Sequence, residues 1–122
     1  MNEICVQTIY VSNLGQAVDF YVGALGYEVE ARYGQCIVQL ATRGTTLVLQ
    51  EIEESQTVPD RPSSVLAFKT DNIDESIKQV IAAGGTVLSD GPQACPVGIY
   101  VSFKDPSGVL HELLQFSGQQ AQ

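Results

Sequence analysis

The chain has 122 residues, of which 44% are hydrophobic, enough for one compact domain that buries roughly two-thirds of its unfolded surface. The formal net charge is −8 at pH 7, which argues against a nucleic-acid-binding surface and favours a cationic small molecule or a basic partner. The same net charge is also consistent with a cytosolic protein in which the charge only maintains solubility. No apolar run reaches the length of a membrane span, and the N-terminus lacks a signal-peptide pattern. We therefore expect a cytoplasmic protein with no nucleic-acid or membrane partner.

The cysteines are widely spaced, at Cys5, Cys36 and Cys95. An odd number without a C-x-x-C pair favours neither a disulfide framework nor a thiolate zinc site. We expect buried or half-buried thiols. Cys95 lies in a segment rich in glycine and proline, and it is the one to examine for reactivity.

The chain contains one pattern twice. Residues 4–29 align with residues 63–88 without a gap, and the ends of the two copies align again after an insertion in the second. We therefore expect a single domain, 1–122, with repeats 1–53 and 63–116, an acidic linker 54–62 and a flexible tail 117–122. Two such repeats that share an apolar face tend to form a concave ligand surface between them. The matched pairs include Val6 with Val65, Asn13 with Asn72, Gly26 with Gly85, and Val48 with Glu112.

In the first repeat, the alternating residues Ile4–Val11 predict a strand. Ser12-Asn13 offers an N-cap, and the apolar spacing that follows Leu14 predicts a helix ended by Gly26. The segments 27–33, 35–41 and 45–51 predict three further strands. The expected order is β-α-β-β-β.

The second repeat follows the same plan. A strand is expected over Val65–Thr70, an N-cap at Asp71-Asn72, and a helix that ends at Gly84-Gly85. Asp105–Gly108 has the composition of a tight turn. Further strands are expected over 86–89, 99–103 and 109–116, with a loop over 90–98. The prediction is an α+β fold of two βαβββ repeats with eight strands and two helices.

These residues resemble the vicinal oxygen chelate superfamily, which includes glyoxalase I, extradiol dioxygenases, fosfomycin-modifying enzymes and bleomycin-resistance proteins. The resemblance extends to about residue 116. It implies an eight-stranded curled sheet of half-barrels around a cavity, two helices on the outside, and a homodimer. Because this superfamily spans several chemistries, the fold alone does not fix a function. The matching stretches are VSNL at 11–14, AVDFY at 17–21, LGY at 25–27, AGG at 83–85, and Phe103–Gly108 running into His111-Glu112-Leu113.

In metal-dependent members, the first and last strand of each repeat supply four ligands to one divalent ion. At the four corresponding positions of this chain, the resemblance implies only one side chain that could bind a metal. Valine offers no oxygen or nitrogen atom to a metal, and Glu51 lies on the opposite face from Val48 by strand parity. We therefore expect no metal and no cofactor. The four positions are Val6, Val48, Val65 and Glu112.

The remaining candidate residues follow from strand parity. Glu112 is either a structural remnant or the polar anchor of an apolar pocket, where burial would raise its pKa and favour a cationic or hydrogen-bond-donating ligand. It is also a candidate general base, although no partner nucleophile or oxyanion donor is apparent. His111 points to the opposite face, under a helix, as a packed residue with one hydrogen-bonded nitrogen. Tyr10 and Lys69 are expected at the cavity rim, and Tyr100 facing the cavity.

The sequence therefore predicts a metal-free protein of the bleomycin-resistance type that sequesters a cationic or aromatic small molecule. Two alternatives stay open. One is a metal-dependent glyoxalase-like lyase or dioxygenase, and the other is an association module with a vestigial pocket. The sequence leaves catalysis undecided and favours a role without it.

Overall fold

The computed structural model describes residues 1–53 and 63–118. The chain divides into an N-terminal unit, residues 6–65, and a C-terminal unit, residues 1–5 with 66–122. Each unit contains one predicted repeat almost entirely. The predicted linker 54–62 and residues 119–122 of the predicted tail lie outside the described residues.

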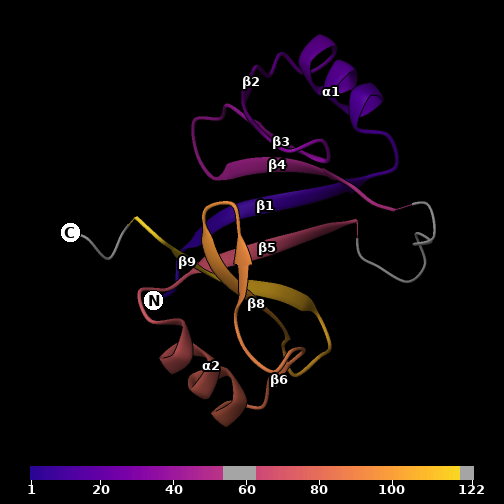
Figure 1. Cartoon of the computed structure of the whole chain (residues 1–122). Helices are drawn as coiled ribbons and strands as arrows, with labels where there is room; N and C mark the ends of the chain where they lie inside the picture. Colours follow the sequence, from indigo (N-terminus) through magenta and orange to yellow (C-terminus); the bar gives the residue numbers. More distant parts are fainter. Residues whose placement is uncertain (54–62, 119–122) are drawn as a thin grey trace. The chain divides into compact units, whose positions relative to one another are not determined.

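The N-terminal unit packs one helix against one face of a four-stranded sheet (Figure 1). Its strands lie in the order β2-β3-β4-β1. β1 runs parallel to β4, and the β2–β3 and β3–β4 pairs are antiparallel. The buried core consists of Leu14, Val38, Leu40 and Leu49. The elements are β1 (Ile4–Val11), α1 (Leu14–Gly23), β2 (Val29–Tyr33), β3 (Ile37–Leu40) and β4 (Thr46–Glu51).

The C-terminal unit repeats this arrangement, with α2 against the strands β5-β9-β8-β6 (Figure 1). β5 runs parallel to β9, and β8 is antiparallel to β9 and to β6. The buried core consists of Ile73, Val101, Phe103 and Leu113. The elements are β5 (Ser64–Lys69), α2 (Ile73–Ala82), β6 (Thr86–Val87), β7 (Gln93–Cys95), β8 (Gly98–Lys104) and β9 (Leu110–Phe116).

Both helices begin at the predicted asparagine N-cap. Asn13 Oδ1 accepts the backbone N–H of Gln16 at 2.9 Å, and Asn72 Oδ1 accepts that of Glu75 at 3.1 Å. The first turn of a helix leaves four N–H groups without an intrahelical partner, and the asparagine side chain satisfies one of them. Both caps are confirmed.

A second side chain caps each helix from the end of the repeat's last strand. Glu51 Oε1 accepts the N–H of Leu14 at 3.0 Å, and Gln115 Oε1 accepts the N–H of Ile73 at 2.7 Å. Glu51 therefore points toward α1, which agrees with its expected position on the face opposite Val48. The two caps occupy equivalent positions of the repeat and make equivalent contacts.

The α+β class and the βαβββ order of both repeats are confirmed, and the Asp105–Gly108 turn forms with the Gly108 N–H donating to the Asp105 carbonyl at 2.9 Å. One prediction is wrong. The segment 90–98 is not entirely a loop, because Gln93–Cys95 forms β7 and pairs with β8. Within the described ranges, 1–53 and 63–118, no helix is long and apolar enough to cross a membrane.

Each sheet has a second face, opposite its helix, which we call the helix-free face. The register of paired strands and the alternation of side chains assign residues to it. In the N-terminal unit it carries Val6, Thr8, Tyr10, Ala31, Tyr33, Ile37, Gln39, Thr46, Val48 and Gln50. In the C-terminal unit it carries Ala67, Lys69, Gln93, Cys95, Tyr100, Ser102, Leu110, Glu112 and Leu114.

Candidate functional site

Glu112 lies on the helix-free face of the C-terminal unit, on the strand between β5 and β8. Its cross-strand neighbours are Ala67 on β5 and Ser102 on β8. Leu110 and Leu114 lie beside it along β9 on the same face. Partial burial among these groups raises the pKa of the Glu112 carboxyl, because it removes water from the charged form. A carboxylate held in this way favours a ligand that supplies a positive charge or a hydrogen-bond donor.

Tyr100 lies on the same face and one strand away. Its hydroxyl donates to Gln93 Oε1 at 3.0 Å across the β7–β8 pair. Burial raises the pKa of Tyr100, and the charges of Glu112 and Cys95 raise it further. The phenol is therefore uncharged at neutral pH and offers a fixed ring beside the carboxylate.

The predicted site residues fall into two groups, one in each unit. Val6, Tyr10 and Val48 share the helix-free face of the N-terminal unit, where Val48 lies beside Thr8. Lys69, Tyr100 and Glu112 share that of the C-terminal unit. Val65 lies on β5 and is buried.

The side chains at the four family positions do not fit a divalent ion. Val6, Val48 and Val65 carry no ligand atom, and the strand neighbours of Glu112 are Ala67 and Ser102. Across residues 1–53 and 63–118, no group of three or more His, Cys, Asp or Glu side chains is placed to hold a metal. Hard divalent ions require several oxygen ligands, which these four side chains do not supply.

His111 lies on the opposite face from Glu112, in the apolar layer beneath α2. Its ring centroid is 5.3 Å from that of Phe68 and 5.6 Å from that of Phe103, and Phe103 belongs to the α2-facing core. The predicted packed histidine is confirmed. The expected hydrogen-bonded nitrogen is not found among the described residues, because Nδ1 is buried without a partner.

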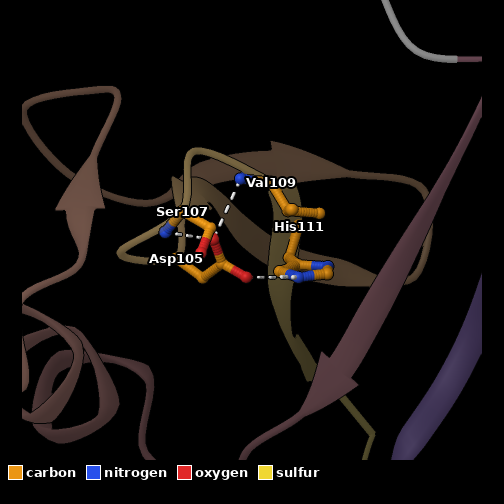
Figure 2. Close-up of polar contacts among 4 residues, drawn as sticks. All are labelled: Asp105, Ser107, Val109 and His111. Atoms are coloured by element: carbon orange, nitrogen blue, oxygen red, sulfur yellow. Dashed lines mark hydrogen bonds and ion pairs between the residues drawn. The ribbon is translucent and has the colours of Figure 1, made fainter.

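The other ring nitrogen of His111 approaches Asp105, as Figure 2 shows. The Nε2 to Oδ2 distance of 3.9 Å is that of an ion pair and is too long for a hydrogen bond. Asp105 Oδ1 accepts the backbone N–H groups of Ser107 at 2.9 Å and Val109 at 3.0 Å. These hydrogen bonds, that from Val109 first, and the nearby His111 hold the pKa of Asp105 below its ordinary value. This cluster stabilises the turn between β8 and β9.

Sequence reasoning missed a hydrogen-bonded group on the helix-free face of the N-terminal unit. Tyr33 donates its hydroxyl to Gln39 Oε1 at 3.0 Å, and Gln39 Nε2 donates to Glu30 Oε2 at 2.8 Å. The strand register shifts between Val29 and Ala31, which brings Glu30 to Gln39. The period-two pattern used to assign strand faces cannot anticipate such an irregularity.

The N-terminal unit also has an open groove of about 780 Å³. It lies where the loop after α1 meets the β3–β4 turn. None of the predicted site residues lines it. Its lining residues are Gln7, Leu25–Glu28, Ala41–Thr45 and Leu47.

Comparison with known proteins gives one family and a set of similar folds. A family model described as "Glyoxalase/Bleomycin resistance protein/Dioxygenase superfamily" matches residues 4–113. No curated protein matches the chain. All three similar structures described next are 21% identical or less, which shows a shared fold and nothing finer.

The first is a hypothetical protein from Bacillus halodurans C-125, with 21% identity, a TM-score of 0.76, and coverage of 93% of this chain and 94% of that one. The second is methylmalonyl-CoA epimerase from Mycobacterium tuberculosis, with 21% identity, a TM-score of 0.74, and coverage of 97% and 90%. The third is a glyoxalase/bleomycin resistance protein/dioxygenase superfamily member from Vibrio splendidus 12B01, with 19% identity, a TM-score of 0.67, and coverage of 94% and 99%.

Proposed function

The chain belongs to the glyoxalase/bleomycin resistance protein/dioxygenase superfamily, and from that premise we propose that it binds a cationic, planar small molecule without a metal. Glu112 is the polar anchor of the binding surface, and Tyr100 supplies a ring against which a planar ligand stacks. Ala67, Leu110 and Leu114, on the helix-free face of the same C-terminal unit, are its apolar members. Lys69, on the same face of this unit, is its rim group.

One observation carries this proposal, namely the environment of the Glu112 carboxyl. It lies among the side chains of Ala67, Leu110 and Leu114, and burial raises its pKa. Within residues 1–53 and 63–118, no Lys, Arg or His forms an ion pair with it. A partly desolvated carboxylate without a cationic partner gains free energy when a ligand supplies the missing charge.

The proposal is tested with proflavine, a planar organic cation whose fluorescence reports binding, and with the neutral planar molecule acridone as comparison. We expect saturable binding of proflavine, weaker binding of acridone, and a loss of roughly tenfold or more in proflavine affinity for Glu112→Gln, the scale of a lost charged contact. Glu75→Gln is the matched control, because it removes the same charge from an exposed position on α2.

Equal losses in the two variants would mean that proflavine follows the net charge of −8 rather than Glu112, and would contradict the proposal. The pH dependence gives a second readout. Because binding needs the ionised carboxylate, proflavine affinity should fall as pH decreases through the raised pKa of Glu112. Glu112→Gln should lose that dependence.

A second candidate is an enzyme in which Glu112 exchanges a proton with the ligand. A carboxyl whose pKa is raised by burial is better suited to general acid–base catalysis than an ordinary carboxyl, and methylmalonyl-CoA epimerases are among the similar structures. Metal content separates a metal-dependent enzyme from the binding protein. After incubation with nickel, zinc, manganese or iron and desalting, about one ion per chain would favour a metal-dependent enzyme, and near-zero occupancy would count against that form of the second candidate.

A further inference from the structure

We propose that the helix-free face of the N-terminal unit carries a separate binding site for a neutral carboxamide group. The site consists of Tyr33, Gln39 and Glu30, which lie on β2 and β3. It goes beyond the proposed function and does not depend on Glu112.

The irregularity in β2 builds this site. Val29 pairs with Leu40 and Ala31 pairs with Gln39, so Glu30 is an extra residue between two consecutive pairs. Leu40 belongs to the core beneath α1, whereas Gln39 lies on the helix-free face. A bulge re-aims the side chain of its extra residue, and here the Glu30 carboxylate reaches the amide of Gln39 at 2.8 Å.

The two hydrogen bonds fix the direction of the Gln39 amide. An ionised carboxylate only accepts hydrogen bonds, so the end of Gln39 that meets Glu30 must be its NH₂ group. The carbonyl end therefore meets Tyr33, whose hydroxyl must donate to it at 3.0 Å. Turning the amide over would place the Gln39 carbonyl against the Glu30 carboxylate, which has no donor, so the Glu30 contact holds the amide in this direction.

Within residues 1–53 and 63–118, one donor and one acceptor of the Gln39 amide have no protein partner. A glutamine amide has two N–H donors and two acceptor lone pairs, and these two contacts occupy one of each. The remaining donor and acceptor lie in one plane on a partly buried side chain, whose strand neighbours on this face are Ala31 and Val48. A ligand that packs against Ala31 and Val48 covers this amide and must match its donor and acceptor, because a polar group buried without a partner is costly.

A carboxamide, urea or lactam offers a donor and an acceptor in one plane, and so matches Gln39 group for group. A carboxylate ligand is disfavoured, because it has no donor and is repelled by Glu30. An apolar ligand leaves the Gln39 groups unmatched. The structure therefore assigns the site to a neutral amide rather than to an acid or a hydrocarbon.

Benzamide is the test probe, with benzoate and ethylbenzene as comparisons. In a titration of the ¹⁵N-labelled full chain, we expect the side-chain NH₂ signals of Gln39 to shift saturably with benzamide, and to shift little with the other two. The exposed Gln35, in the β2–β3 turn of the same unit, is the internal reference. Equal, unsaturated shifts at Gln35 and Gln39 would overturn the inference.

Variants then identify the groups responsible. Glu30→Gln removes the group that fixes the amide direction and should weaken benzamide binding about fivefold, the scale of one net hydrogen bond. Gln39→Leu should abolish the binding, and Gln35→Leu should leave it unchanged. If Gln39→Leu does not fold, the benzamide affinity of Glu30→Gln still tests the inference, because residue 30 is exposed and its substitution leaves the core unchanged. Wild-type affinity in Glu30→Gln would overturn the inference.

The same titration separates this site from the proposed function. Glu112→Gln should leave benzamide affinity within about twofold of the wild type, whereas its expected effect on proflavine is roughly tenfold. A fall in benzamide affinity as large as that caused by Glu30→Gln would overturn the inference of a separate site. Failure of proflavine to bind, with benzamide still bound at Gln39, would count against the proposed function alone.

Discussion

The two units have the same plan and differ in chemistry on the helix-free face, where we propose that ligands bind. At the ends of their last strands, Glu51 and Gln115 make the same contact with the start of a helix. Three residues earlier, Val48 in one unit corresponds to Glu112 in the other. The first pair faces the helix and the second lies on the helix-free face.

This difference shows which constraints a repeated unit retains. Helix-facing positions must fill a packed core or satisfy helix N–H groups, so a change in polarity there is costly. The change from Leu47 to His111 is such a case, because the buried Nδ1 of His111 has no hydrogen-bond partner among the described residues. Helix-free positions lie outside the helix-covered core and are less restricted by it. The divergence between Val48 and Glu112 therefore changes the chemistry of the surface while leaving the fold of each unit intact.

The largest expected effect comes from substitutions in the two buried cores. Leu49 and Leu113 occupy equivalent positions and are 0% and 3% exposed. Leu49→Ala and Leu113→Ala should each lower the free energy of unfolding by about 2–5 kcal/mol, because each removes buried methyl groups and leaves a cavity. Urea denaturation measures both. Val109→Ala, at a half-exposed position, should change it by about 0.5 kcal/mol or less.

A markedly smaller cost for Leu113→Ala than for Leu49→Ala would break the equivalence of the two cores. It would mean that the C-terminal unit relaxes around the cavity more completely than the N-terminal unit does. The imidazole of His111, which takes the place of Leu47, is the difference in packing that such a result would implicate.

The strand-end caps should give a smaller and equal effect. Glu51→Ala and Gln115→Ala each leave one helix N–H without its side-chain acceptor, and each should lower the free energy of unfolding by about 1 kcal/mol. Urea denaturation of both variants checks this, with the exposed Glu53→Ala as a control. A loss confined to one variant would show that only one repeat depends on its strand-end cap.

The smallest expected effects are those of pH on stability. Within the C-terminal unit, the carboxyl groups of Asp105 and Glu112 should change the free energy of unfolding in opposite directions as pH falls. The pKa of Asp105 is lowered in the folded chain, so its contribution to stability is present above the unfolded value of 3.8 and is lost as pH falls through the folded value. Asp105→Asn should therefore be less stable than the wild type at neutral pH. The deficit should close in acid.

Glu112 should behave in the opposite way. Its folded pKa is raised, so the associated stability is present below the unfolded value of 4.5 and is lost as pH rises through the folded value. Glu112→Gln should then be more stable than the wild type at neutral pH, and the gain should vanish in acid. Thermal melts from pH 3 to pH 8 check both signs. Parallel pH profiles for the two variants would contradict them.

The sequence predicted the features that depend on local pattern. The asparagines before each helix and the Asp105–Gly108 turn carry their own signals, and the internal repeat supported the order of elements. The sequence did not predict β7. Its three residues lie in a segment rich in glycine and proline and are too few to show the alternation of a strand. Only the pairing with β8, in which Gln93 lies opposite Tyr100, identifies them as a strand. The sequence predicted that Glu51 lies at a strand end, but it did not predict the hydrogen bond from the Leu14 N–H to Glu51. That bond joins residues far apart in the chain and has no local signal.

The candidate site divides in the same way. Strand parity placed Glu112 and His111 on opposite faces, and the structure agrees. Parity could not find Glu30, because a register shift in β2 carries it to Gln39. The missing hydrogen bond at His111 Nδ1 was equally unpredictable, since it depends on which polar groups reach the apolar layer.

The strand-end caps also bear on the order in which the chain acquires its structure. Asn13 can cap α1 as soon as the helix exists, but Glu51 is 37 residues beyond Leu14, and Gln115 is 42 residues beyond Ile73. During synthesis, each helix is therefore only half capped until the last strand of its repeat has emerged and paired. Contacts of this separation carry a loop-closure cost and slow folding, so full stability of each helix marks the completion of its whole repeat.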